Sequence, residues 1–222
     1  MLFVPPAPEV VAARVDAVRQ QIQAAGRTPA DVRIVAVTKG FTEAAVQAAL
    51  AAGIPDIGEN YAGELLAKAN QGAQGAVTWH YLGAIQRRKV PSLAPVVSIW
   101  QGVCRQAEGE AIAAHSPGAT VLVQVDVTGL PGRHGCAPGD TGVLVKDLQR
   151  LGLDVRGLMA VGAPGGPEAA RPGFRLLRQL ADETGLPELS MGMSDDLEAA
   201  LAEGSTMLRV GRTLFGPRPR RP

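Results

Sequence analysis

The sequence is short of the residues that usually build disulfide scaffolds and metal centres. Its 222 residues include only two cysteines, Cys104 and Cys136, and three histidines, at positions 80, 115 and 134. Two cysteines are too few for a disulfide framework, and their spacing matches no zinc motif. The scattered histidines do not indicate a metal site either. The sequence therefore predicts neither a disulfide-rich fold nor a metal centre.

Charge of one sign and long apolar runs are also missing. The 22 basic and 21 acidic residues leave a formal net charge of +1, too weak a field to predict binding to nucleic acid or a membrane surface. No uncharged apolar segment is long enough to span a bilayer. Residues 1–10 lack a basic region, and their prolines interrupt any signal-peptide core. We therefore expect a reduced, cytoplasmic protein without nucleic-acid or membrane partners.

Lysine is the scarcest of the charged residues. The chain has four lysines, at positions 39, 68, 89 and 146, among its 22 basic residues. Arginine supplies most of the basic surface. A lysine in an unusual place is therefore less easily explained as a generic surface charge.

Short apolar runs alternate with helical patterns along the whole chain. We expect strands at residues 32–38, 55–59, 78–83, 96–100, 120–127, 155–161, 188–192 and 206–210. Helical patterns between them cover residues 42–53, 61–70, 141–152, 174–185 and 194–204, and another helix is expected at about 8–25. Strands that alternate with helices favour a parallel sheet, and about eight strands match a (β/α)8 TIM barrel.

An open doubly wound sheet is the alternative architecture. No G-x-G-x-x-G motif follows the first strand, so a dinucleotide site has little support. We expect a single domain over residues 1–222, with its core at about 8–216 and a short basic tail at 217–222.

Lys39 ends the apolar run "VRIVAVTKG". Active sites of parallel barrels collect where the strands end, and alternation along the strand places Val35, Val37 and Lys39 on one face. Above an apolar floor, desolvation would lower the pKa of the amine and expose a nucleophile. Position alone also allows a lysine that merely starts a solvated loop.

Two further stretches, near the end of the chain, could bind an anion. In "LSMGMSDDLEAALAEG", Ser194 could be a helix N-cap or could hold a phosphate with the helix N-terminus. In "TMLRVGRTLFG", Arg209 lies inside an apolar strand and Gly211 follows it. These residues could form a structural ion pair and a tight turn, or they could complete the phosphate site common after the last two strands of a barrel. Together with Lys39, they could hold a phosphorylated aldehyde.

Seven segments carry a resemblance to a known family. They read "VAVTKG", "IGENYAGELLAK", "WHYLGAIQRRK", "VLVQVDV", "GLMAV", "LSMGMSDDLEAAL" and "GSTMLRVGRTLFG". The chain resembles the pyridoxal 5′-phosphate (PLP) homeostasis proteins of the YggS and PROSC type, which share the barrel of the alanine racemase N-terminal domain. The resemblance runs from about residue 32 to 216, and the segment from 189 to 211 is its most specific part.

The resemblance implies a role for each matching residue. Lys39 would bind PLP as an internal aldimine, and Arg209 would lie near the pyridine nitrogen. Ser194, Gly211, Arg212 and Thr213 would bind the phosphate. Asn60 would lie at the pocket edge, although a helix N-cap explains it equally well, while His80 and Met159 are interpreted as core residues.

The chain departs from the family pattern at several positions. Arg212 stands where the family has threonine after the glycine, and Thr213 could supply the displaced hydroxyl. Ala84 replaces a common histidine, Arg87 and Arg88 replace Ser-Asn, and Arg133-His134 replaces Lys-Ser. These changes bear on phosphate affinity and on any second basic site.

The resemblance implies reversible binding, buffering and delivery of PLP without catalytic turnover. An arginine at the ring nitrogen cannot give up a proton, so the ring is a weaker electron sink. Alanine racemases also need a C-terminal β-domain and a partner tyrosine, which neither Tyr61 nor Tyr81 evidently supplies. The alternatives are a racemase-like enzyme, an imine-forming aldolase and a binding module that uses the basic run at 87–89 and the tail. We expect a monomer whose partners are PLP and recipient apo-enzymes.

Overall fold

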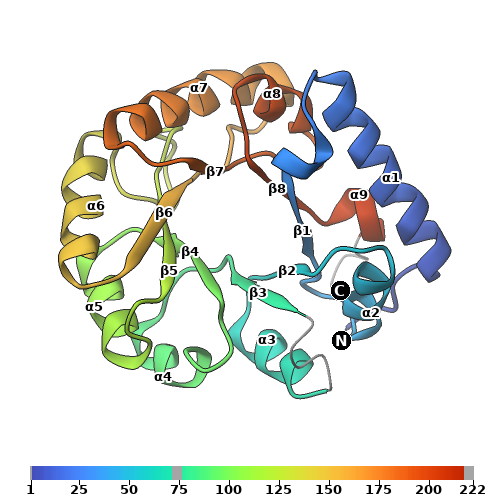
Figure 1. Cartoon of the computed structure of the whole chain (residues 1–222), viewed down its shortest axis with the longest axis horizontal. Helices are drawn as coiled ribbons and strands as arrows, with labels where there is room; N and C mark the ends of the chain where they lie inside the picture. Colours follow the sequence, from blue (N-terminus) through green and yellow to red (C-terminus); the bar gives the residue numbers. More distant parts are fainter. Residues whose placement is uncertain (1, 72–76, 218–222) are drawn as a thin grey trace.

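Eight parallel strands close into a barrel in the computed structural model, which describes residues 2–71 and 77–217 (Figure 1). Each strand pairs with the next along the chain, and the last strand pairs with the first through Val35 and Arg209. The predicted (β/α)8 barrel is confirmed. The open-sheet alternative is wrong, because this last pairing closes the sheet.

The strands lie where the apolar runs predicted them, with one clear shift. They are β1 (Arg33–Val37), β2 (Asp56–Glu59), β3 (Thr78–Tyr81), β4 (Ile99–Val103), β5 (Thr120–Gln124), β6 (Asp154–Met159), β7 (Glu188–Ser190) and β8 (Met207–Val210). The fourth strand was predicted at 96–100. It begins later because the amides of Val96 and Val97 both donate to the Leu93 carbonyl and end a short helix there.

Helices surround the strands as an outer ring (Figure 1). They are α1 (Pro8–Ala24), α2 (Ala44–Ala51), α3 (Ala62–Ala69), α4 (Val90–Leu93), α5 (Gln106–His115), α6 (Thr141–Arg150), α7 (Pro167–Thr184), α8 (Leu197–Ala202) and α9 (Arg212–Phe215). Every helix in the described ranges is too short or too polar to cross a membrane. The basic tail, apart from Pro217, lies outside the described residues.

The N-terminal helix fills a gap in this ring. The helix that follows β8, α9, has only four residues, and α1 packs beside it and against α2 (Figure 1). Val11, Val15, Val18 and Ile22 recur on one face of α1 and are all buried. Because the apolar stripe has helical spacing, α1 buries it against the barrel. The predicted extra helix is thus the element that covers the β8–β1 junction.

The side chains on the two faces of the strands belong to different apolar clusters, as the two-residue alternation predicted. Val35 and Met207 belong to the apolar cluster inside the barrel, together with Leu122. Ile34 and Leu208 belong to the larger core beneath the helices. Residues that share a face with Val35 or Met207 therefore point toward the barrel axis, and those beyond the strand ends reach its rim.

Candidate functional site

A cavity of about 1120 Å³ opens at the carboxyl ends of the strands. Six of the seven predicted site residues line it, and they are Lys39, Asn60, Ser194, Arg209, Gly211 and Arg212. Thr213 does not line the cavity and lies one residue further along α9. The fold thus brings together residues that are up to 173 positions apart in the chain. Whether they contact a cofactor stays a prediction.

Lys39 sits in a tight turn directly after β1, where it is half-buried. Gly40 follows at φ 80°, a left-handed conformation that favours glycine. The backbone on both sides of Lys39 is held by α3: Lys68 Nζ donates to the Thr38 carbonyl at 2.8 Å, and the Gly40 amide donates to Glu64 Oε2 at 2.7 Å. The turn that presents the Lys39 amine is therefore fixed on each side.

Lys68 itself is buried, with 2% of its surface exposed. Its ammonium group pairs with Glu59 at the end of β2, and Thr38 Oγ1 donates to the same Glu59 oxygen at 2.6 Å. Burial raises the pKa of Glu59 in spite of the neighbouring ammonium. Sequence reasoning did not assign Lys68 a role, although the scarcity of lysine was a signal that could have singled it out.

Arg209 lies inside the barrel at the cavity floor and is 5% exposed. Its guanidinium donates to the Ser190 carbonyl at 2.6 Å, to Ser190 Oγ at 2.7 Å and to the Ala160 carbonyl at 2.7 Å. Within the described ranges it forms no salt bridge, so the ion-pair interpretation is wrong. Burial lowers the pKa of Arg209 to about 10, which leaves it charged at neutral pH.

A chain of hydrogen bonds continues from Arg209 through the barrel interior. Ser190 Oγ donates to Gln101 Oε1 at 2.6 Å, and Gln101 Nε2 donates to His80 Nδ1 at 2.7 Å. His80 Nε2 then donates to Asp56 Oδ1, 2.9 Å away at the start of β2. The interpretation of His80 as a core residue holds, but it is a polar member of that core. Ser190 and Gln101 were missed, although Gln101 is a polar residue in an otherwise apolar strand.

Asn60 follows β2 and lines the cavity. Its alternative role as a helix N-cap is wrong, because α3 begins at Ala62 and Tyr61 occupies the cap position. Asn60 Oδ1 is buried and has no hydrogen-bond partner among the described residues. A buried amide oxygen without a partner costs about 1–3 kcal/mol, so this atom favours a ligand in the cavity that donates to it.

Ser194 joins the loops that follow β7 and β8. The prediction that it opens a helix is wrong, because α8 begins at Leu197 with Asp196 at its N-cap. Asp196 accepts from the Met193 amide at 2.5 Å and turns the chain there. Ser194 Oγ instead accepts from the Thr213 amide at 3.1 Å. The two predicted phosphate-binding segments are therefore in contact.

Gly211 is small because β1 approaches it closely. A Cβ placed there would lie 3.1 Å from the Val37 carbonyl oxygen, so any larger residue would have to push β1 back slightly. The next residue, Arg212, forms an exposed ion pair with Asp195, and both side chains lie at the cavity rim. The Arg212 guanidinium therefore points toward a carboxylate of the protein itself and is not reserved for a bound anion.

The remaining departures from the family pattern separate into two groups. Ala84 and His134 line the cavity, so they bear directly on what it binds. Arg87, Arg88 and Arg133 are exposed and do not line it. Met159 packs in the interior apolar cluster, as its predicted core role requires, and it also lines the cavity.

Comparison with known proteins gives one consistent result. Residues 13–219 match the family described as the alanine racemase N-terminal domain. The chain is 43% identical over 216 residues to the pyridoxal phosphate homeostasis protein of Pseudomonas aeruginosa, covering 94% of this chain and 93% of that protein.

Solved structures share the fold of this chain. A protein of unknown function from Bifidobacterium adolescentis superposes with a TM-score of 0.85 at 31% identity, covering 97% of this chain and 98% of the other. PipY of Synechococcus elongatus, solved with PLP bound, superposes with a TM-score of 0.80 at 30% identity, covering 93% of this chain and all of PipY.

Proposed function

Because the chain belongs to the pyridoxal phosphate homeostasis protein family, within the alanine racemase N-terminal domain group, we propose that it binds PLP reversibly and takes part in PLP homeostasis. In this role it holds the cofactor and releases it to recipient apo-enzymes. We also propose that the chain is one PLP-binding domain, a monomer, and that it works in the cytoplasm.

The observation that carries the proposal is the shared cavity. Lys39 from the end of β1 and Arg209 from β8 line the same space, whose rim also includes Ser194 and Gly211. PLP supplies an aldehyde, a pyridine nitrogen and a phosphate. Those three groups match an amine, a buried cation and a pair of loops that contact each other. The unpartnered Asn60 Oδ1 supports a ligand in the same cavity.

Each residue takes a role that its position allows. The Lys39 amine would hold the aldehyde carbon of PLP through a covalent bond whose formation releases water, and Lys68 and Glu64 hold the turn that carries Lys39. Arg209 donates to the ring nitrogen with the donor capacity left after its bonds to Ser190 and Ala160. The phosphate contacts the loop segments of Ser194 and of Gly211 to Thr213.

The proposal of a carrier rather than an enzyme rests on Arg209. A guanidinium that stays charged at neutral pH donates a hydrogen bond but does not protonate the pyridine. Without that proton the ring draws electrons weakly, which disfavours carbanion chemistry. Tyr81 is buried and does not line the cavity, whereas Tyr61 lines it at an exposed position.

Borohydride reduction tests the site. The full chain is incubated with PLP, reduced with borohydride, digested and mapped by mass spectrometry. We expect a phosphopyridoxyl group on Lys39 and a visible absorbance that disappears in Lys39→Ala. The exposed Lys146→Ala serves as the matched control and should label normally. An adduct found only on Lys68, Lys89 or Lys146 would overturn the assignment of Lys39.

A racemisation assay tests carrier against enzyme. We expect PLP-loaded protein to racemise alanine no faster than free PLP at the same concentration. If the loaded protein racemises it faster and Tyr61→Phe removes that activity, the racemase-like alternative replaces the carrier.

A further inference from the structure

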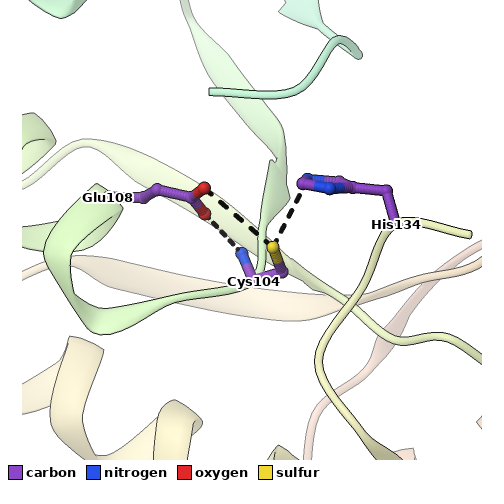
Figure 2. A group of neighbouring side chains, drawn as sticks. All are labelled: Cys104, Glu108 and His134. Carbon is purple, nitrogen blue, oxygen red and sulfur yellow. Dashed lines mark hydrogen bonds between the residues drawn. The ribbon is translucent and has the colours of Figure 1, made fainter. Parts of the chain in front are cut away.

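Cys104, Glu108 and His134 form a cluster beside β4 and β5, the strands that lie across the barrel from β1 (Figures 1 and 2). Cys104 follows β4, Glu108 lies in the first turn of α5, and His134 lies in the loop between β5 and α6. Cys104 and His134 are 30 residues apart in sequence, so no local motif joins them. The pairing of β4 with β5 brings these two strand ends together.

The three side chains point their donor atoms at one another (Figure 2). Cys104 Sγ lies 3.3 Å from His134 Nε2 and 4.0 Å from Glu108 Oε1. A tetrahedral zinc ion with bond lengths of about 2.0–2.3 Å holds its ligand atoms about 3.6 Å apart. The two observed distances bracket that value, so small rotations of the side chains would complete three of the four positions of such a shell.

Glu108 is oriented for this role by its own contacts. Its Oε2 accepts from the amides of Cys104 at 2.8 Å and Arg105 at 3.1 Å, which fixes the carboxylate. Its Oε1 faces the thiol and also accepts from the Arg105 guanidinium at 2.5 Å. The Arg105 side chain is 66% exposed, so it can leave Oε1 to a cation without breaking the two backbone contacts.

The cluster also has an entry path. His134 is half-buried and lines the large cavity, whereas Cys104 and Glu108 are buried behind it. A cation in the cavity therefore meets the imidazole first and the other two ligands next. The three protein ligands would leave a fourth coordination position for water or a ligand.

We propose that Cys104, Glu108 and His134 form a binding site for a divalent cation of the zinc class. A thiolate, an imidazole and a carboxylate together select Zn²⁺ over Mg²⁺ or Ca²⁺, which prefer oxygen ligands. The cation replaces the thiol proton, so each binding event releases one proton to solvent. The site ties the β5–α6 loop to the start of α5, and it does not depend on the proposed PLP function.

Cation binding by the reduced full chain tests the proposal. After removal of bound metals with a chelator, equilibrium dialysis against ZnCl₂ should load one zinc per chain. Co²⁺ should give the visible bands of tetrahedral cobalt together with a thiolate charge-transfer band. Cys104→Ser should remove the charge-transfer band and weaken zinc binding at least about tenfold.

Two further variants keep the test decisive. His134→Gln changes a half-buried side chain, so it should keep its fold and still lose the tetrahedral cobalt spectrum. Cys136→Ser removes the other buried cysteine and should bind zinc like the unaltered chain. Circular dichroism confirms the fold of each variant. The proposal is overturned if the unaltered chain does not load zinc, if Cys104→Ser and His134→Gln still load it fully, or if the loss follows Cys136.

Discussion

Lys68 on α3 and Arg209 on β8 are both buried cations, but their charges are balanced in different ways. Lys68 pairs with the carboxylate of Glu59, and a second carboxylate, Glu64, lies 3.9 Å away. Arg209 is held by two carbonyl oxygens and a hydroxyl. A carboxylate neutralises its partner, whereas carbonyl dipoles satisfy the donors and leave a full positive charge.

That difference separates a supporting residue from a binding residue. The Lys68 ammonium group binds groups of the protein itself, including the Thr38 carbonyl next to Lys39. The Arg209 charge is still available at the cavity. The charge of Asp196 acts on Arg209 by raising its pKa, but the Asp196 carboxylate is engaged with the Met193 amide. We therefore expect the two cations to respond differently when each is removed.

Lys68→Met should cause the larger loss of stability. It leaves the Glu59 carboxylate buried without its cation, and breaking a buried pair in this way costs about 3–5 kcal/mol. Chemical denaturation measures the change. Adding Glu59→Gln in the same chain should recover much of the loss, because no buried charge then remains. The exposed Lys146→Met is the control, and a Lys68→Met chain as stable as that control would contradict the comparison.

Arg209→Met should cost less stability and more ligand affinity. The carbonyls of Ser190 and Ala160 lose their donor, a penalty of about 1–3 kcal/mol for each group, but removal of a buried unpaired charge offsets part of it. A net loss of about 1–3 kcal/mol is expected, with PLP affinity at least tenfold weaker by absorbance titration. Arg88→Met, at an exposed position, should change neither quantity. Unchanged PLP affinity in Arg209→Met would remove Arg209 from the site.

His80, at the far end of the hydrogen-bond chain that starts at Arg209, should affect the pH dependence of the free energy of unfolding. Burial lowers the pKa of His80, and the hydrogen bond to Asp56 only partly opposes it. Folded His80 therefore stays neutral where the unfolded histidine, with a pKa of about 6.5, takes up a proton. The free energy of unfolding therefore decreases as the pH falls below about 6.5, by up to about 1.4 kcal/mol per pH unit.

His80→Gln isolates this contribution from that of other buried groups such as Glu59, whose pKa is raised by burial. Denaturation of the unaltered chain and the variant between pH 5 and pH 8 gives a difference curve. It should slope below about pH 6.5 and be flat above it. His115→Gln, at an exposed position, is the matched control. A flat curve for His80→Gln would mean that His80 is not held neutral.

Local patterns were enough to predict the barrel and the neighbourhood of the site. The two-residue alternation that placed Lys39 with Val35, and Arg209 with Met207, is intrinsic to a strand, so it survives folding unchanged. Because parallel strands end at one rim, six of the seven predicted residues line one cavity. Family resemblance added the identity of the ligand, which no periodicity contains.

Contacts between distant segments could not be predicted in this way. The chain of Ser190, Gln101 and His80 depends on which strands face each other across the barrel. The role of Ser194 depends on its contact with the Thr213 amide, which comes from a different loop. The cluster of Cys104 and His134 needs the register of two neighbouring strands. Each of these is a tertiary relation that a linear pattern leaves open.

The ion pair of Arg212 and Asp195 extends the comparison to an exposed pair, for which the smallest effects are expected. Their side chains are 58% and 68% exposed, and pairs of this kind contribute less than about 1 kcal/mol. Arg212→Thr, which restores the family residue, should therefore leave stability nearly unchanged and alter PLP affinity by less than about fivefold. Asp195→Asn should tighten PLP binding slightly at low salt, because it releases the Arg212 guanidinium toward the phosphate. This gain should vanish at high ionic strength, where exposed charges are screened. A loss of PLP affinity beyond tenfold in Arg212→Thr would show instead that the Arg212 charge, and not the backbone of the loop, holds the phosphate.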